Sequence, residues 1–174
     1  MVKGFETAVE RHQRKVYTFA RYYLGNAQEA EDITQEALLK LWQNQQQIDE
    51  EGQRAWLLKV TRNACLDRLR SRTSAARVFK DDPDEQAVSA VAADAPGPEA
   101  RASASGFRRH LRAALEELKD PMKSIVILRE IEGLAYQEIS DVLDVPLNTV
   151  RVYLHRGRRQ LRRQLKEVYD VGSL

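Results

Sequence analysis

Two helical patterns that meet at a short turn constrain the fold of this chain more than any other feature. In the first, Ile139, Val142 and Leu143 recur at the spacing of residues that face a core from one side of a helix. Pro146 cannot continue that helix, and its fixed φ suits the start of another. Asp144 stands in the turn, where the chain requires a left-handed residue and Asp is tolerated. The sequence therefore predicts a helix, a tight turn and a second helix.

The second helix of this pair combines an apolar stripe with a strongly basic face. Asn148 or Thr149 is expected to cap it, and Val150 and Leu154 are expected to point inward. Residues 151–166 contain seven Lys or Arg and no acid, so ion pairs along the helix do not offset the repulsion between these charges. A polyanionic partner would offset it, because counterion release favours binding. The pattern predicts a helix-turn-helix whose second helix enters a DNA major groove; the alternative is a solvated basic face on an ordinary helix.

The composition of the 174 residues excludes several other classes of protein. No apolar run has the length that spans a membrane, and the N-terminus lacks a signal-peptide core, so we expect a soluble, cytoplasmic protein without membrane insertion. The single Cys65 excludes an internal disulfide and a multi-cysteine zinc site. His12, His110 and His155 are scattered along the chain, and we expect neither a bound metal nor a cofactor.

The net charge of +2 conceals an uneven distribution along the chain. Residues 1–75 carry a net charge of +2, residues 76–106 of −3 and residues 107–174 of +3. The middle stretch is rich in Ala, Ser, Asp and Pro, and without apolar periodicity it cannot bury much surface. It therefore predicts a flexible acidic linker between two small helical domains. A short surface helix over residues 85–91 is an alternative that is compatible with a linker.

Three further helices are predicted before the linker. Apolar residues recur at helical spacing over residues 5–24, from about residue 27 to residue 42, and over residues 53–72, with a polar loop before the last of these segments. Gly25 and Asn26 form a stop signal after the first helix. No strand is predicted anywhere, so the fold class is all-α with helix-on-helix packing.

The third of these helices is basic. Asp67 alone opposes its cations, which are Arg54, Lys59, Arg62, Arg68, Arg70 and Arg72. This face is either a second nucleic-acid surface or an ordinary basic exterior. Trp56 in the same helix is expected in the core rather than stacked on a base.

The second helix, in contrast, opens with acids. They are Glu29, Glu31, Asp32 and Glu36. Acids near a helix N-terminus interact favourably with the macrodipole, which is one explanation for them. The other is a face that docks a protein, because acids beside exposed Leu39 and Trp42 would repel DNA.

Two parts of the chain together resemble a known family. Residues 30–42 (AEDITQEALLKLW) and 54–70 (RAWLLKVTRNACLDRLR) look like conserved region 2 of bacterial RNA polymerase sigma factors. Residues 115–165 look like region 4, and the direct succession of these two regions is typical of the extracytoplasmic-function (ECF) group. The resemblance implies region 2 over residues 1–75, a linker over residues 76–106 and region 4 over residues 107–174.

The resemblance implies that the acidic second helix docks on RNA polymerase. Asp32, Gln35 and Glu36 match the helix that binds the clamp coiled coil of the largest subunit, and Leu39 lies on the same helix. The flap of the second largest subunit is implied as a further contact. An anti-sigma factor that holds the protein inactive is implied as another partner.

The same resemblance places two DNA contacts. Asn63 and Asp67, with the loop over residues 48–54, match the part that captures an unstacked base of the −10 element. Nearby phosphates would be held by Arg68, Arg70 and Arg72. Bases of the −35 element would be read by Asn148, Thr149, Arg151, Val152 and His155. Phosphates, which position the protein without specifying sequence, would be held by Arg156, Arg158 and Arg159.

The chain departs from the family pattern at three positions. Val152 and Tyr153 stand where Ser-Arg is common, so the preferred −35 sequence does not carry over. Asp144 stands where Gly is frequent. Cys65 occupies a slot that is usually small and apolar, which predicts a buried, inert thiol rather than a redox sensor.

The resemblance thus implies a sigma factor that binds core RNA polymerase and directs transcription from promoters with −35 and −10 elements, and that is not an enzyme. One rival is a stand-alone helix-turn-helix transcriptional regulator, which explains the C-terminal half but leaves the acidic and basic N-terminal helices unexplained. A second rival is a helical enzyme such as a nuclease. The sequence offers it no metal-ligand cluster, no phosphate-binding Gly-rich loop and no nucleophile–base arrangement.

Overall fold

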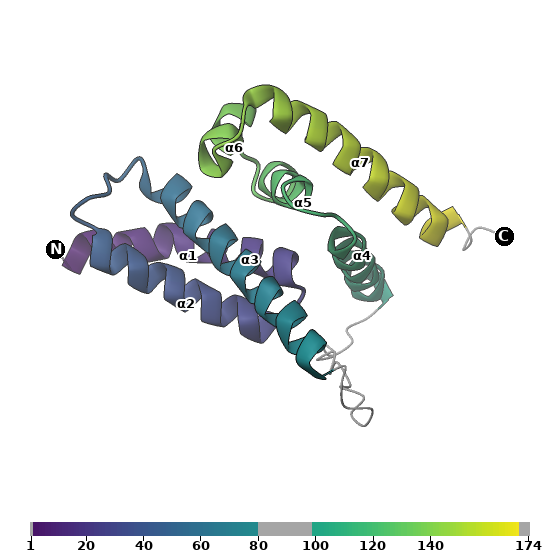
Figure 1. The fold of residues 1–174 in the computed structure, drawn as a ribbon, viewed down its shortest axis with the longest axis horizontal. Coiled ribbons are helices and arrows are strands. Elements are labelled where there is room, and N and C mark those ends of the chain that lie inside the picture. Colours follow the sequence, from purple (N-terminus) through teal and green to yellow (C-terminus); the bar gives the residue numbers. More distant parts are fainter. Residues whose placement is uncertain (1, 80–98, 171–174) are drawn as a thin grey trace.

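The computed structural model describes residues 2–79 and 99–170, and the regular elements there are all helices (Figure 1). They are α1 (Val2–Leu24), α2 (Ala27–Asn44), α3 (Gln53–Phe79), α4 (Glu99–Glu116), α5 (Met122–Val126), the π-helical turn η1 (Ile127–Ile131), α6 (Tyr136–Leu143) and α7 (Leu147–Asp170). No strand occurs in these two stretches, and the all-α class is confirmed. The surface helix considered over residues 85–91 lies outside the described residues.

Helices α1 to α3 form the N-terminal unit, in which all three helices contact one another. The turn between α1 and α2 follows from two residues, as the sequence predicts. Gly25 adopts a φ of 71°, which ends α1 without the steric cost that other residues would meet there. The Asn26 side chain then accepts a hydrogen bond from the Glu29 N–H at 2.9 Å and caps α2.

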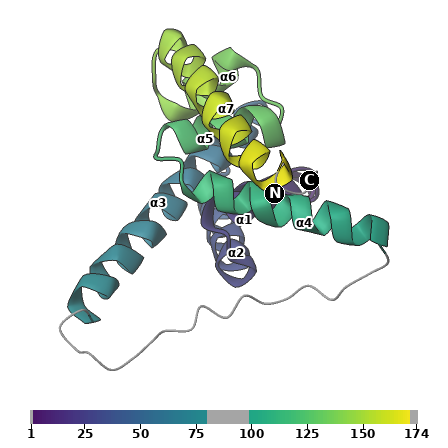
Figure 2. The ribbon, with the colours of Figure 1, turned by 90° about the vertical axis from the view of Figure 1, so that its right-hand side faces the viewer.

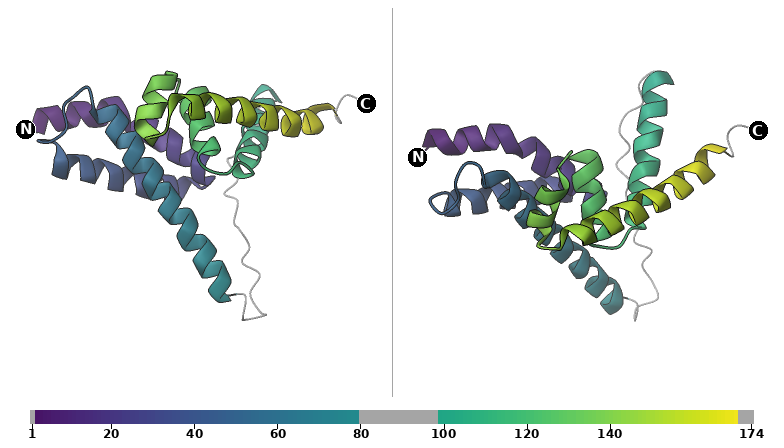
Figure 3. Two further views of the ribbon diagram at one scale, coloured as in Figure 1. Left: turned by 45° about the horizontal axis from the view of Figure 1, so that its top comes forward. Right: turned by 90° about the horizontal axis from the view of Figure 1, so that it is seen from above.

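Two helices extend into the segment expected to be a linker. Helix α3 continues to Phe79 rather than ending at residue 72, because Ala75 and Ala76 favour a helix and no Gly or Pro interrupts it. Helix α4 begins at Glu99, so residues 99–106 are helical although they lack a clear apolar period. Both ends project from the packed body of the molecule (Figures 2 and 3). The residues at the two ends of the segment expected to be a linker, 76–79 and 99–106, are therefore helical.

Helices α4 to α7 form the C-terminal unit. Helix α7 packs on α4, α5 and α6. The fully buried side chains of this unit include Leu115 of α4, Ile139 of α6 and Leu154 of α7. Gly157 allows α7 to approach α5 closely, because a Cβ atom at this position would lie 2.4 Å from a methyl group of Val126. The close approach fixes the direction of α7, which runs along the outer edge of the molecule (Figure 1).

The two units pack against each other. Helix α1 contacts α4 and η1, and α3 contacts α6. One cluster of buried side chains includes Phe19 and Leu58 from the N-terminal unit and Leu118 and Ile125 from the C-terminal unit. A second, smaller cluster around Leu41 belongs to the N-terminal unit alone. The sequence made no prediction of how the two units are arranged.

Candidate nucleic-acid interface

The turn between α6 and α7 has the predicted geometry. Asp144 lies in the left-handed region, with φ 55° and ψ 49°, and it ends α6. The Val145 N–H donates to the Ser140 carbonyl at 3.2 Å, and the Ser140 hydroxyl donates to the Val145 carbonyl at 2.6 Å. Ser140 therefore joins both sides of the turn through its carbonyl and its hydroxyl.

Helix α7 begins two or three residues earlier than expected. It starts at Leu147, and the Val150 N–H donates to the Pro146 carbonyl at 3.2 Å. Asn148 and Thr149 therefore lie within the first turn, and the prediction that one of them caps the helix was wrong. Their place in the first turn leaves Asn148 exposed and Thr149 half-buried.

The buried and exposed faces of α7 are those that the periodicity predicts. Val150 and Leu154 are buried. The opposite face brings together most of the candidate DNA-binding side chains, which are Asn148, Arg151, Val152, His155, Arg156 and Arg159, all exposed. The Arg156 guanidinium lies 5.9 Å from the centre of the Tyr153 ring, a distance suited to a cation–π contact. Because this basic face lies on a helix at the edge of the molecule, it is accessible to a DNA groove.

Arg158 differs from the other arginines of α7. Its Nε atom donates to the Glu130 carboxylate on η1. This hydrogen bond to Glu130 raises the pKa of Arg158, and Tyr136 raises it further. The side chain thus braces α7 against η1, and of the three α7 arginines predicted to hold phosphates it is the one with an ion pair to an acid among the described residues.

The candidate −10 residues lie on the exposed face of α3. Asn63 and Asp67 are one helical turn apart and both exposed. Arg70 pairs with Asp67 at 3.6 Å, but both side chains are 75% exposed, so the pair contributes little stability. Arg72 donates from Nε to the Glu29 carboxylate at 3.2 Å, which ties α3 to the start of α2.

Cys65 lies under this surface and is fully buried. Burial raises the pKa of the Cys65 thiol to about 12, although Lys123 and Arg68 partly oppose the shift. The thiol is therefore protonated at neutral pH and lacks the thiolate character of a reactive cysteine. This environment is the one that the sequence predicts for an inert thiol.

The acidic face of α2 is exposed from Glu31 onward, whereas Glu29 at its start is half-buried against Arg72. Asp32, Gln35, Glu36 and Leu39 all face solvent, and Leu39 is 56% exposed. Glu36 pairs with Lys40 at 2.6 Å within the helix. An exposed Leu among carboxylates suits a protein partner better than DNA, since it offers apolar contact area and repels phosphates.

Two tryptophans of the N-terminal unit were assigned from the sequence. Trp42 is 40% exposed and packs edge-on against Phe5, with ring centres 4.9 Å apart. Trp56 is half-buried and packs against the smaller hydrophobic cluster, as expected for a core residue.

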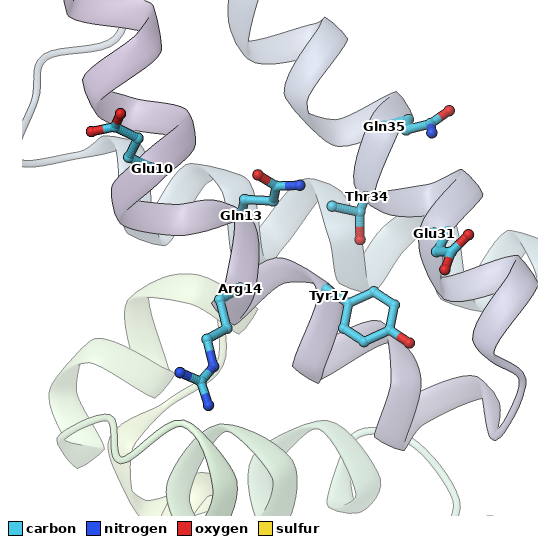
Figure 4. A pocket seen from close by; sticks show the side chains of 7 residues that line it. All are labelled: Glu10, Gln13, Arg14, Tyr17, Glu31, Thr34 and Gln35. Atoms are coloured by element: carbon cyan, nitrogen blue, oxygen red, sulfur yellow. The ribbon is translucent and has the colours of Figure 1, made fainter. Parts of the chain in front are cut away.

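A shallow groove of about 500 Å³ lies between α1 and α2, next to the acidic face (Figure 4). It is lined by Glu10, Gln13, Arg14, Tyr17, Glu31, Thr34 and Gln35. Gln35 belongs to both the groove and the acidic face, so the two form one continuous surface.

Other kinds of site find no support in the residues that the structure describes. Across residues 2–79 and 99–170, no group of three or more His, Cys, Asp or Glu side chains is arranged to hold a metal ion. None of the helices in these stretches combines the length and apolar character needed to cross a bilayer.

Sequence reasoning missed the polar residues that join the two units. Asp120, Lys123 and Glu132 were not singled out, although Lys123 is only 4% exposed. Asp120 contacts residues 97 and 58 positions away in the chain. No local pattern reports contacts at such separations, so no signal in the sequence marked them.

Comparison with known proteins identifies two family regions. The chain matches the Sigma-70 region 2 family over residues 8–75 and the Sigma-70, region 4 family over residues 108–161, which together make up more than half of it. It is 36% identical over 160 residues to the ECF RNA polymerase sigma factor SigE of Mycolicibacterium smegmatis, an alignment that covers 91% of this chain but 60% of that protein. It is 28% identical over 169 residues to the ECF RNA polymerase sigma factor SigW of Bacillus subtilis, covering 95% and 90% of the two chains.

A solved structure shares the fold. The sigma factor RpoE from Bartonella quintana, crystallised in complex with the anti-sigma factor NepR, superposes with a TM-score of 0.71 and 22% sequence identity. The superposition covers 94% of this chain and 98% of that one, so both units and their arrangement are similar.

Proposed function

This chain belongs to the sigma-70 family and is a sigma factor of the ECF group, which directs promoter-specific transcription with core RNA polymerase, and from this premise we propose how its two units share the work. The N-terminal unit binds the polymerase and the −10 element, and the C-terminal unit binds the −35 element. The observation that carries this proposal is the presence, in one chain, of an exposed acidic helix α2 and an exposed basic helix α7. The first suits a protein partner and the second suits DNA.

In the proposal, α7 supplies the upstream anchor. Asn148, Thr149, Arg151, Val152 and His155 read the edges of bases in the major groove. Arg156 and Arg159 hold phosphates, which fix the register of the helix on the duplex. Arg158 contributes to that register indirectly, because its hydrogen bond to Glu130 holds α7 in place.

The N-terminal unit supplies strand opening. Asn63 and Asp67, together with the loop over residues 48–54, capture a base that has left the stack, and Arg68, Arg70 and Arg72 hold neighbouring phosphates. Capture of an unpaired base offsets the cost of unstacking it. The chain itself makes and breaks no covalent bond in this scheme, so it acts as a specificity subunit and not as an enzyme.

Core RNA polymerase makes these two weak contacts effective together. Asp32, Gln35, Glu36 and Leu39 dock on the clamp of the largest subunit, and the C-terminal unit contacts the flap of the second largest. Once one unit is bound to the polymerase, binding of the other becomes an intramolecular event with a high effective concentration. The site of action is therefore the cytoplasm, where the polymerase meets the chromosome.

An anti-sigma factor is proposed as a regulatory partner. The similar structure from Bartonella quintana contains one, and this chain has an exposed apolar side chain, Leu39, on the face proposed for the polymerase. A protein that covers this face would compete with the polymerase.

Run-off transcription tests the proposed function. Core RNA polymerase with and without the chain is supplied with a library of randomised promoters, and the transcripts are sequenced. The expected result is a set of transcripts that depend on the chain and share two sequence elements upstream of the start. A chain that leaves the transcript profile of core polymerase unchanged would refute the proposal.

A stand-alone helix-turn-helix regulator is not favoured. It accounts for α6 and α7 but not for the Sigma-70 region 2 match over residues 8–75. It also gives no role to the exposed acids of α2.

A further inference from the structure

One apolar side chain interrupts the polar face that α7 presents to solvent. Val152 is 37% exposed. The helix packs on the rest of the C-terminal unit through four buried residues, which are Val150, Leu154, Gly157 and Leu161. Because each residue of a helix advances about 100° around the axis, Val152 lies almost opposite to this buried side. It therefore lies at the centre of the face proposed for DNA.

The neighbours of Val152 on this face are polar. Asn148 and His155 lie one turn before and one turn after it, Arg159 lies two turns after it, and all three are exposed. Val152 belongs to neither of the two buried clusters that the described residues form. A β-branched side chain also does not favour a helix. Single exposed apolar residues are common on protein surfaces, so the position of Val152 within this face, rather than its exposure, carries the argument.

Two arginines that follow Val152 are held on the flanks of α7. The guanidinium of Arg156 lies 5.9 Å from the centre of the Tyr153 ring, and Tyr153 is half-buried and packs against the larger cluster. Arg158 is bonded to Glu130 of η1. These contacts hold both guanidinium groups to the sides of the helix, so neither covers Val152.

Val152 also lies near the end of α7 that would enter a DNA groove. The helix begins at Leu147, and at ~1.5 Å per residue Val152 lies ~8 Å from that start. The major groove is ~8.5 Å deep, and the N-terminal residues of the second helix of a helix-turn-helix contact the base edges. Val168, a second exposed valine of the same helix, lies ~32 Å from the start, beyond the reach of that groove.

A valine side chain matches only one kind of group in the major groove. It neither donates nor accepts a hydrogen bond, whereas every base pair presents donors or acceptors there. A valine pressed against those atoms would remove their water and leave them without a partner, which is costly. Thymine alone among the four bases also presents an apolar group, its C5 methyl. Val152 therefore favours a thymine opposite it over the other bases.

We propose that Val152 recognises the methyl group of one thymine in the −35 element. The proposal rests on the proposed function, because it assigns a base to a side chain that this function places in the major groove. Arg156 and Arg159 hold the register in which the contact forms, through the phosphates. Burial of a group the size of one methyl changes the affinity about fourfold.

Deoxyuridine tests this contact, because it differs from thymidine only in lacking the methyl group. The −35 element is first identified by run-off transcription from randomised promoters, with core RNA polymerase and the full-length chain. Each thymine of the element, on either strand, is then replaced in turn by deoxyuridine, and binding of the promoter to the complex of polymerase and chain is titrated. Val152→Ala removes the methyl groups that would touch the thymine. Val168→Ala is the matched control, since Val168 is 43% exposed on the same helix.

The wild-type chain is expected to lose about fourfold in affinity when one particular thymine is replaced, and little when any other is. Val152→Ala is expected to bind the unsubstituted promoter about fourfold more weakly than the wild type. It is also expected to show no response to replacement of that same thymine. Val168→Ala is expected to behave like the wild type. Such non-additivity between a change in the protein and a change in the DNA identifies a direct contact.

Three results overturn the proposal. They are a wild-type chain that responds to no thymine replacement, a Val152→Ala chain that keeps the full wild-type response, and a −35 element without thymine on either strand. If circular dichroism shows that Val152→Ala has lost helix, Val152→Thr takes its place, since it keeps the shape of the side chain and replaces one methyl by a hydroxyl. A smaller response than that of the wild type is then expected, and an equal response overturns the proposal.

Run-off transcription separates this proposal from the function on which it rests. Transcripts that depend on the chain, together with any of the three overturning results, refute the contact of Val152 alone. The absence of transcripts that depend on the chain refutes the proposed function, and the contact of Val152 with it.

Discussion

Helices α3 and α7 are both rich in arginine, but their arginine side chains have very different neighbours. On α7, which runs along the edge of the molecule (Figure 1), Arg151, Arg156 and Arg159 are exposed. On α3, Arg54 and Arg62 are paired with acids of the C-terminal unit. The comparison teaches that a count of cations does not identify an available DNA-binding surface. Helix α7 presents exposed cations, whereas two of the cations of α3 already have acidic partners.

The largest expected effect concerns the packing of α7 on the rest of the C-terminal unit, which holds its basic face in position. Leu154 is 1% exposed, and Leu154→Ala is expected to lower the free energy of unfolding by about 2–5 kcal/mol, since it leaves a cavity under the helix. Val152→Ala, on the exposed face of the same helix, is expected to change it by no more than ~0.5 kcal/mol. Urea denaturation followed by circular dichroism measures both. Equal losses for the two variants would show that the faces of α7 are wrongly assigned.

A second prediction separates two adjacent arginines of α7. Arg159→Ala is expected to weaken binding to a duplex and to reduce the salt dependence by about one counterion, because it removes a phosphate contact. Arg158→Ala is expected to change the salt dependence less and the thermal stability more, because Arg158 is bonded to Glu130. DNA-binding titrations over a range of salt concentrations, with melting curves, measure the difference. The reverse pattern would contradict the division between free and committed cations.

A third prediction tests the junction between the units through pH. Burial raises the pKa of Glu132 to about 7, although Lys15 and Arg54 partly oppose the shift. The folded protein therefore holds this proton at pH values where the unfolded chain has released it, so stability from this group falls as the pH rises from about 4.5 to about 7. Glu132→Gln is expected to remove that part of the pH dependence and to be more stable than the wild type at pH ~8. Denaturation at pH ~4.5 and at pH ~8 measures the difference, with Glu117→Gln, at an exposed position in the turn after α4, as the control.

The smallest effect is expected at Cys65. Its thiol is buried in the cluster shared by the two units, and burial raises its pKa to about 12. The wild-type chain is therefore expected to react slowly with a thiol-specific reagent. Asp120→Asn is expected to react faster, because it weakens the contacts of Asp120 with Tyr23 and Arg62 that hold the units together over this cluster. The absorbance of the released chromophore follows the reaction. Rapid reaction of the wild-type chain in its native state would show that the units do not remain packed.

The sequence predicted correctly those features that depend on residues close together in the chain. The apolar stripes of α6 and α7, and the left-handed turn at Asp144, follow from residues within a few positions of one another. The start of α7 was wrong because Pro146 is followed by helical backbone at once, so Asn148 and Thr149 fall inside the helix. The end of α3, expected at about residue 72, was wrong because Ala75 and Ala76 continue the helix without an apolar period.

The junction at Asp120 was not predictable in this way. Tyr23, Arg62 and Asp120 are brought together only by the packing of helices far apart in the sequence. Nothing in the residues around Asp120 distinguishes it from the other acids of the chain. The candidate DNA contacts could be named from sequence, but which of them are free could not.

DNA binding in the presence and absence of core RNA polymerase tests the central claim most directly. A promoter duplex selected by run-off transcription is titrated with the chain alone, with core polymerase alone and with both together, at physiological salt. The account predicts specific binding, abolished by changes in the −10 or −35 element, only when both proteins are present. Tight, sequence-specific binding by the chain alone, unaffected by core polymerase, would contradict it.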